Sequence, residues 1–274
     1  MAFLKNFIMG LVSGIAEFLP ISSAAHRQIT GVIFGTGAAD PVRNLFIHIA
    51  VLFAVYSATA KKRERLKNAA RKQRRKKNGT NSNSLANAEY KLLRTATLPL
   101  LIIFFLLIYL LPIHDNLIIT SLLLLVNGIL IFLPDRMLQG NKNAKVITPF
   151  DAVFIGIAGA LSAFPGFSRI GCVMAAAALR GADKKSSGNW ALMLSIPALT
   201  AWILVDLISL FTWVGIPFWS NLIFYLIGGI SAYLGSRLGI YVLRKHIRIN
   251  GCAGYAYYCW GASLLTLILF LTVV

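Results

Sequence analysis

The 274-residue chain is 57% hydrophobic and only 13% charged, and its mean hydropathy is +0.72. A soluble domain of this length would expose far more charge, so the composition excludes that class and indicates a polytopic membrane protein. The formal net charge of +18 raises the alternative of a nucleic-acid partner. Eleven of the 27 Lys and Arg residues fall between Lys61 and Lys77, however, directly after an apolar segment. The positive-inside rule explains that cluster, and we expect no nucleic-acid binding.

Apolar segments of two kinds follow one another along the chain. Segments broken by Gly or Pro predict re-entrant helical hairpins, because irregular backbone at membrane depth needs protein or a water-filled cavity around it. Unbroken segments of about 20 residues predict spanning helices. The first half then contains a hairpin at 3–30 and spans at about 43–60, 91–111 and 117–133, with a basic loop at 61–90. The second half contains a hairpin at 150–179 and spans at about 190–211, 221–243 and 253–274.

The two halves, 1–134 and 135–274, resemble each other at their broken segments. With an offset of 145, Gly14 matches Gly159, Pro20 matches Pro165, and Ser23 matches Ser168. The loops at 61–90, 135–149, 180–189 and 244–250 are basic and are expected to be cytoplasmic, which places both termini outside and makes the two hairpins enter from opposite faces. The sequence therefore predicts an all-α integral membrane protein with an inverted-topology repeat, each half a re-entrant hairpin plus three transmembrane helices.

Ionisable residues inside the broken segments are the candidates for chemistry, because charge at membrane depth is costly. Arg169, near the tip of the second hairpin, suits a phosphate clamp; the alternatives are that it snorkels to the cytoplasmic face or pairs with an acid. Glu17 has three possible roles: it orients His26, holds a divalent cation, or forms an ion pair with Arg169.

Ser23 and His26 are three residues apart, so on a helix they share a face. An imidazole beside a hydroxyl can serve as its general base, or can itself attack phosphorus. The alternative is structural: a Ser pair after Pro caps a membrane helix, and a single His satisfies one hydrogen bond. His48, Asp206 and Arg237 are further candidates for buried polar residues, and Asp206 is expected to balance an Arg.

At the two broken segments the sequence resembles the undecaprenyl-diphosphate phosphatase family, also called the bacitracin-resistance family. The first family motif is similar to E-G-x-x-E-F-L-P-x-S-S-T-G-H, and residues 13–26 read S-G-I-A-E-F-L-P-I-S-S-A-A-H. The second is similar to P-G-x-S-R-S-G-x-T, and residues 165–173 read P-G-F-S-R-I-G-C-V. The resemblance covers nearly the whole chain, with weaker similarity around His48 and between Leu194 and Asp206.

The resemblance implies an enzyme of the bacterial plasma membrane that removes the terminal phosphate of a polyprenyl diphosphate. It implies catalytic roles for Glu17, Ser23, His26 and Arg169, with Ser23 as nucleophile and His26 as its base; direct attack by His26 stays open. The expected substrate-binding residues are Ser22, Gly166, Ser168 and Arg169. Glu17 is the expected ligand of a magnesium or calcium ion. The expected partners are the polyprenyl diphosphate and membrane lipids.

Several polar motif positions are small or apolar in this chain. The first motif Glu is Ser13, and the usual Thr-Gly before the His is Ala24-Ala25. The Gln usual six residues before Pro165 is replaced, as are the Ser and Thr of the second motif; the residues here are Gly159, Ile170 and Val173. The loss of one carboxylate predicts low-to-moderate cation dependence, and the loss of donors predicts weaker diphosphate binding or a changed substrate. It also leaves two alternatives to the phosphatase: a polyprenyl-phosphate lipid translocase, or a non-catalytic lipid-binding homologue.

Overall fold

The computed structural model describes residues 1–36, 40–75, 84–111, 116–136, 140–211, 218–249 and 252–273. Within these ranges the chain is helical and contains no β-strand. The first half forms α1 (Ala2–Phe18), α2 (Ser23–Phe34), α3 (Pro41–Ala58), α4 (Ala60–Arg75), α5 (Leu85–Leu110) and α6 (Leu117–Arg136). The second half forms α7 (Pro149–Ala160), the 3₁₀ turn η1 (Leu161–Ala163), α8 (Arg169–Leu179), α9 (Lys184–Leu210), α10 (Phe218–Ile249) and α11 (Ala253–Val273).

Five of the described helices are long and apolar enough to cross a membrane: α3, α5, α9, α10 and α11. The remaining expected span, 117–133, corresponds to α6, whose apolar stretch Leu117–Phe132 is shorter. The predicted elements are therefore present as helices, with ends shifted by several residues in places. The composition and the helices agree on an all-helical membrane protein.

The prediction of a loop throughout 61–90 is wrong, because residues 60–75 continue from α3 as the helix α4. Lys, Arg, Ala, Leu and Gln all have high helix propensity, so a basic run need not be irregular. Lys62 Nζ lies 2.5 Å from Glu89 Oε1 on α5, which joins the basic helix to the next span. Residues 76–83 of the expected loop, including most of its polar run, lie outside the described residues.

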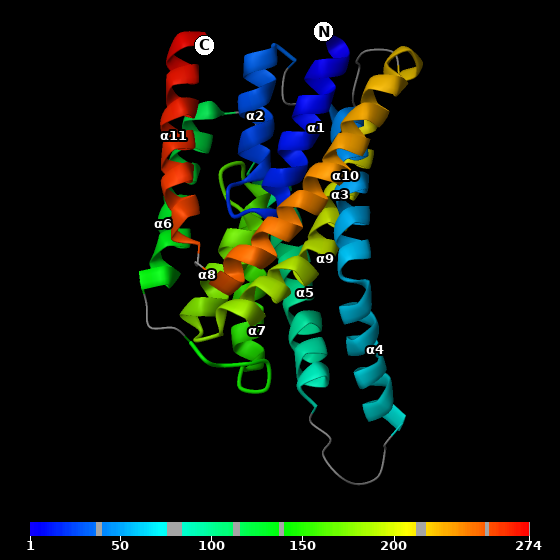
Figure 1. Ribbon diagram of the computed structural model, residues 1–274, viewed down its shortest axis with the longest axis vertical. Helices are drawn as coiled ribbons and strands as arrows, with labels where there is room; N and C mark the ends of the chain where they lie inside the picture. The colour runs from blue at the N-terminus through cyan, green and yellow to red at the C-terminus, as the bar shows by residue number, and fades with distance from the viewer. Residues whose placement is uncertain are drawn as a thin grey trace.

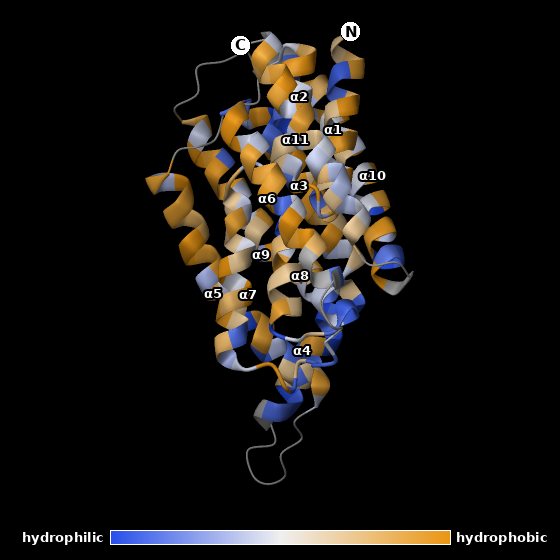
Figure 2. Ribbon diagram, turned by 90° about the vertical axis from the view of Figure 1, so that its left-hand side faces the viewer, coloured by the Kyte–Doolittle hydropathy of each residue, from blue (hydrophilic) through white to orange (hydrophobic). Residues whose placement is uncertain are grey.

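Both termini lie at one end of the molecule and α4 lies at the other (Figure 1). α1 and α2 occupy the half that carries the termini, whereas α7 lies toward the end of α4. Hydrophilic residues concentrate around α4 at this second end, and apolar residues cover much of the helices above it (Figure 2).

Small residues let α1 approach α10 closely. A Cβ atom on Gly10 would lie 2.1 Å from the Gly228 carbonyl oxygen, and one on Gly14 would lie 2.1 Å from that of Ala232. Such contacts between small residues are the usual way that membrane helices pack, since lipid offers no hydrophobic driving force between them. α7 approaches α5 in a similar manner, because a Cβ on Gly156 would lie 2.2 Å from the Ala96 carbonyl oxygen. Both broken segments are thus fixed to a long helix by close backbone contact.

Candidate active site

The breaks between α1 and α2 and between α7 and α8 meet inside the protein. The backbone N–H of Gly166 donates to Ser22 Oγ at 3.0 Å. The hydroxyl of Ser168 donates to the carbonyl oxygen of Leu19 at 3.1 Å. From α6, the Asn127 side chain accepts from the Ser168 N–H at 2.9 Å and donates to the Pro20 carbonyl at 3.3 Å. Three of the expected substrate-binding residues, Ser22, Gly166 and Ser168, are therefore engaged in joining the two breaks.

Each break ends at a serine that caps the following helix. Ser22 Oγ accepts from Ala25 N at the start of α2, and Ser168 Oγ accepts from Gly171 N at the start of α8. The caps differ in number by 146 rather than the expected 145, so Ser22, and not Ser23, corresponds to Ser168. Ser23 and Arg169 are consequently the first residues of their helices. The N-termini of α2 and α8 therefore both lie where the two breaks meet, and helix N-termini favour anions.

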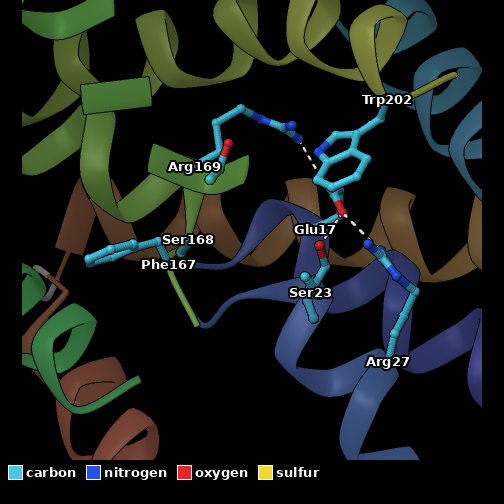
Figure 3. Close-up of a pocket in the computed structure, with 10 residues that line it drawn as sticks. Glu17, Ser23, Arg27, Phe167, Ser168, Arg169 and Trp202 are labelled. Carbon is cyan, nitrogen blue, oxygen red and sulfur yellow. Dashed lines mark hydrogen bonds and ion pairs between the residues drawn. The ribbon is translucent and has the colours of Figure 1, made fainter. Parts of the chain in front are cut away.

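Glu17, near the end of α1, connects these two helix starts. The Ser23 hydroxyl donates to Glu17 Oε2, and Arg169 Nη2 donates to Glu17 Oε1. Arg27 Nη1 lies 3.9 Å from Glu17 Oε2. Figure 3 shows the guanidinium groups of Arg169 and Arg27 directed at Glu17 from two sides, with Ser23 beside it. The Glu17 carboxylate therefore accepts from the expected nucleophile, Ser23, and lies between two guanidinium groups.

Burial of this cluster decides between the alternatives for Arg169. Arg169 is only 4% exposed and Glu17 only 8%. Arg169 Nε donates to Ser195 Oγ on α9 at 3.1 Å, which leaves the guanidinium well inside the protein. Arg169 therefore does not snorkel to the surface; it pairs with an acid at the meeting of the breaks. A buried ion pair is weak evidence for stability, because desolvation offsets most of its attraction.

His26 is turned away from Ser23, although the two residues share α2. Its Nδ1 lies 2.7 Å from the Ser22 carbonyl oxygen, and its Nε2 lies 2.7 Å from the Tyr258 hydroxyl on α11. The two rings also stack, with centroids 5.6 Å apart. The hydrogen bond that His26 would need as the base of Ser23 is absent, because other groups occupy both ring nitrogens and the Ser23 hydroxyl donates to Glu17.

The further polar candidates separate into a buried pair and a surface residue. His48 Nδ1 lies 2.6 Å from Asp206 Oδ2, so a His is the hydrogen-bond partner of Asp206. Asp206 also interacts electrostatically with Arg27, in agreement with the expectation that it balances an Arg. The His48 ring stacks on Trp202, with centroids 5.6 Å apart, and Trp202 in turn lines the pocket described below. Arg237 is exposed and donates to Ser57 Oγ at 3.3 Å, which corrects its prediction as a buried group.

A small pocket with a cavity volume of about 10 Å³ lies over Glu17. That volume is room for about one water molecule, so a phosphate group enters only if the side chains around it move apart. Its lining combines the starts of α2 and α8 with two arginines and one carboxylate, which favours an anionic ligand. The lining residues are Ala16, Glu17, Ser23, Ala24, Arg27, Ser162, Phe167, Ser168, Arg169 and Trp202.

The donor set does not fit a resident divalent cation. Among the described residues no group of three or more His, Cys, Asp or Glu side chains is placed to hold a metal ion. Both oxygens of Glu17, the expected ligand, are bonded by Ser23 and Arg169. Ser13, at the other motif carboxylate position, offers a neutral hydroxyl that is buried without a hydrogen-bond partner in the described part of the chain. Two guanidinium groups beside a single carboxylate repel a divalent cation.

Several residues of the site were not predicted from the sequence. Ser195, Asn127 and Tyr258 contact Arg169, the breaks and His26 from α9, α6 and α11. Of these, Ser195 carried a weak signal, because it lies in the segment between Leu194 and Asp206 that resembles the family. Arg27 carried a usable signal, since it is a charged residue within an apolar broken segment. It lies directly after His26, but a pattern of nucleophile and base alone does not include it.

Comparison with known proteins identifies the family of the chain. A family model described as bacitracin resistance protein BacA matches residues 6–265. An undecaprenyl-diphosphatase of Methanococcus maripaludis is 26% identical over 264 residues, covering 96% of this chain and 99% of that protein. Undecaprenyl-diphosphatase 3 of Bacillus cereus is 28% identical over 271 residues, or 98% of each chain. An undecaprenyl-diphosphatase of Prochlorococcus marinus is 28% identical over 262 residues, or 91% of each. The range matched by the family model includes both breaks.

Proposed function

The chain belongs to the bacitracin resistance protein BacA family, and from this premise we propose that it is an undecaprenyl-diphosphate phosphatase. It removes the terminal phosphate of the lipid diphosphate and yields the monophosphate carrier used in cell-wall synthesis. The observation that carries the proposal is the cluster at the meeting of the breaks, where Glu17 binds both the Ser23 hydroxyl and the Arg169 guanidinium. A nucleophile, a proton acceptor and a phosphate-binding cation are then adjacent in one buried site.

The contacts support a two-step displacement. Ser23 Oγ attacks the terminal phosphorus, its proton passes to Glu17, and the bond to the bridging oxygen breaks to release undecaprenyl monophosphate. The departing monophosphate takes that proton from Glu17, which returns to its carboxylate form. Water then attacks the phosphoserine: its OH joins phosphorus, its other proton passes to Ser23 Oγ as the phosphoserine bond breaks, and inorganic phosphate leaves. Arg169 and the N-termini of α2 and α8 stabilise the charge that develops on the phosphoryl oxygens. Glu17 replaces His26 as the proposed base, because it is the group that the Ser23 hydroxyl contacts.

His26 fits this scheme as a positioning residue. Its contact with the Ser22 carbonyl holds the turn that precedes Ser23. Ser22 has a backbone φ of 66°, a left-handed conformation that is unfavourable for a residue other than glycine. His26 therefore contributes to holding a strained turn that aims Ser23. For direct attack on phosphorus, its Nε2 would first have to leave Tyr258.

We also propose that residues 1–134 and 135–274 form an inverted-topology repeat. Two reciprocal contacts support it, since α1 packs on α10 of the other half and α7 packs on α5. α1–α2 and α7–α8 are the proposed re-entrant hairpins, which enter from opposite faces and meet at their breaks. The concentration of hydrophilic residues around α4, opposite both termini, supports external termini in a plasma membrane (Figures 1 and 2).

The alternative function is a polyprenyl-phosphate translocase, or a homologue that binds the lipid without cleaving it. The hairpins that meet midway favour the translocase, because paired broken segments of this kind underlie alternating access. The apolar replacements at Ile170 and Val173, both fully buried, favour binding without turnover. Neither alternative requires the contact between the Ser23 hydroxyl and Glu17.

Phosphate release from undecaprenyl diphosphate by the purified protein tests the proposal. We expect the wild-type protein to release phosphate and Arg169→Ala to lose activity roughly 100-fold or more, as when one buried transition-state donor is removed. The matched control is Arg237→Ala, which removes an exposed arginine that donates to Ser57 and should leave the rate unchanged. Wild-type protein that binds the lipid but releases no phosphate would refute the phosphatase and favour the translocase.

A further inference from the structure

Arg27 brings a second guanidinium group into the pocket over Glu17. It lies on α2, one turn after Ser23, and is 9% exposed. Its Nη1 atom is buried and has no hydrogen-bond partner among the described residues. Glu17 Oε2 lies 3.9 Å from this Nη1 atom, which is too long for a hydrogen bond. A buried guanidinium N–H without an acceptor is costly, and it calls for a ligand or a function.

The serine hydroxyls and the other arginine of the pocket already donate to protein acceptors. The hydroxyls of Ser23, Ser162 and Ser168 donate to Glu17, to the Gly159 carbonyl and to the Leu19 carbonyl, respectively. Arg169 donates to Glu17 through Nη2 and to Ser195 through Nε. Arg27 Nη1 is therefore a donor at the pocket that the protein itself leaves unused.

The charges of the residues that line the pocket also favour an anionic ligand. Arg27 and Arg169 together carry two positive charges, and Glu17 is the carboxylate among the lining residues. Asp206, outside the lining, accepts from His48 and also interacts electrostatically with Arg27. A positive charge that has been removed from water is stabilised when an anion enters beside it, and a guanidinium suits the oxygens of a phosphate. Glu17 meets Arg169 on one side and Arg27 on the other (Figure 3), so an anion at Glu17 has a cation on each side.

We propose that Arg27 is a phosphate-binding residue of this chain, donating from Nη1 to the diphosphate of the lipid on the side of Glu17 opposite Arg169. The inference rests on the proposed function, because the anion that it assigns is a polyprenyl diphosphate. Arg27 gives this site a second cation that binds phosphate, since the serine hydroxyls of the lining already donate to protein acceptors. Two cations also favour the diphosphate substrate over the less charged monophosphate product.

Equilibrium binding tests the role separately from catalysis. Arg27→Gln and Arg27→Lys are compared in a Ser23→Ala background, so that bound undecaprenyl diphosphate is not consumed. Undecaprenyl diphosphate and uncharged undecaprenol are the two ligands. Arg237→Gln in the same background is the control for loss of an arginine charge outside the pocket. Thermal unfolding of each variant without ligand reports whether Arg27 has only a structural role.

We expect Arg27→Gln to weaken binding of undecaprenyl diphosphate roughly 10- to 100-fold, the effect of one hydrogen bond to a charged group. Arg27→Lys, which keeps the charge but loses the fork, should weaken it less, and neither variant should change undecaprenol binding. The unfolding temperature of Arg27→Gln should not fall, since Arg169 still pairs with Glu17. Diphosphate affinity that is unchanged in both variants would overturn the inference, as would an equal loss for undecaprenol. If wild-type protein binds the diphosphate but does not cleave it, the proposed function fails while the binding role of Arg27 stands.

Discussion

Glu17→Gln is the substitution that most directly disturbs the cluster at the meeting of the breaks. The amide keeps the size of the side chain but removes the negative charge that binds Arg169 and faces Arg27. It also removes the carboxylate that receives the Ser23 hydroxyl. One change therefore acts on the proposed base and on the charge balance of the pocket.

The burial of Glu17 and its contact with Ser23 indicate how much stability and how much activity Glu17→Gln should lose. Glu17 is 8% exposed, so its loss leaves two arginines in a buried pocket without their carboxylate. Removing one partner of a buried ion pair destabilises a protein by about 3–5 kcal/mol. Loss of a general base lowers kcat by about 10²- to 10⁴-fold. A phosphate ion would partly replace the missing charge, so inorganic phosphate should raise the unfolding temperature of Glu17→Gln more than that of the wild-type protein.

The assay combines phosphate release from undecaprenyl diphosphate with thermal unfolding at several phosphate concentrations. Glu64→Gln is the matched control, because Glu64 is an exposed carboxylate on α4. It should change neither the rate nor the response to phosphate. A Glu17→Gln protein that is folded and keeps the wild-type kcat would refute the argument that Glu17 receives the Ser23 proton.

Three further predictions follow from the same contacts. Tyr258→Phe removes the hydroxyl partner of His26 Nε2. We expect only a moderate loss of kcat, because His26 Nδ1 still contacts the Ser22 carbonyl. A gain of activity would instead indicate that Tyr258 restrains a His26 that attacks phosphorus directly. Gly166→Ala should lower the free energy of unfolding by about 1–3 kcal/mol, because Gly166 has a φ of 113° and its added Cβ would lie 2.4 Å from Leu123 Cβ; thermal unfolding checks this, and an unchanged midpoint would contradict the close approach. EDTA should change phosphate release little, since the oxygens of Glu17 are bound by protein groups; abolition of activity by EDTA, with recovery on adding magnesium, would show that a cation takes part.

The breaks could be predicted from the sequence because their signals are local. Pro20 and Pro165 interrupt apolar segments, and the serine after each break is a typical helix cap. The contact between Glu17 and Arg169 was among the stated alternatives, since a buried cation in a membrane protein usually has an acid near it. These inferences need only composition and short-range spacing.

The partners of His26 could not be predicted in this way. Its spacing to Ser23 is compatible with a shared helix face, but the orientation of the ring depends on Tyr258, which is 232 residues away in the chain. The shape of α4 was also missed, because positive charge reports the side of the membrane and says little about helix or loop. The orientation of the His26 ring therefore depends on long-range contacts, and the helical structure of α4 depends on helix propensity.

Phosphate release by Ser23→Ala, measured beside the wild-type protein and His26→Ala, tests the central claim most directly. The account predicts that Ser23→Ala abolishes release from undecaprenyl diphosphate, while His26→Ala keeps part of the activity because His26 positions the turn before Ser23. The contradictory result is a Ser23→Ala protein that still releases phosphate together with a His26→Ala protein that releases none. That result would place the attacking group on His26 and remove Ser23 and Glu17 from the reaction.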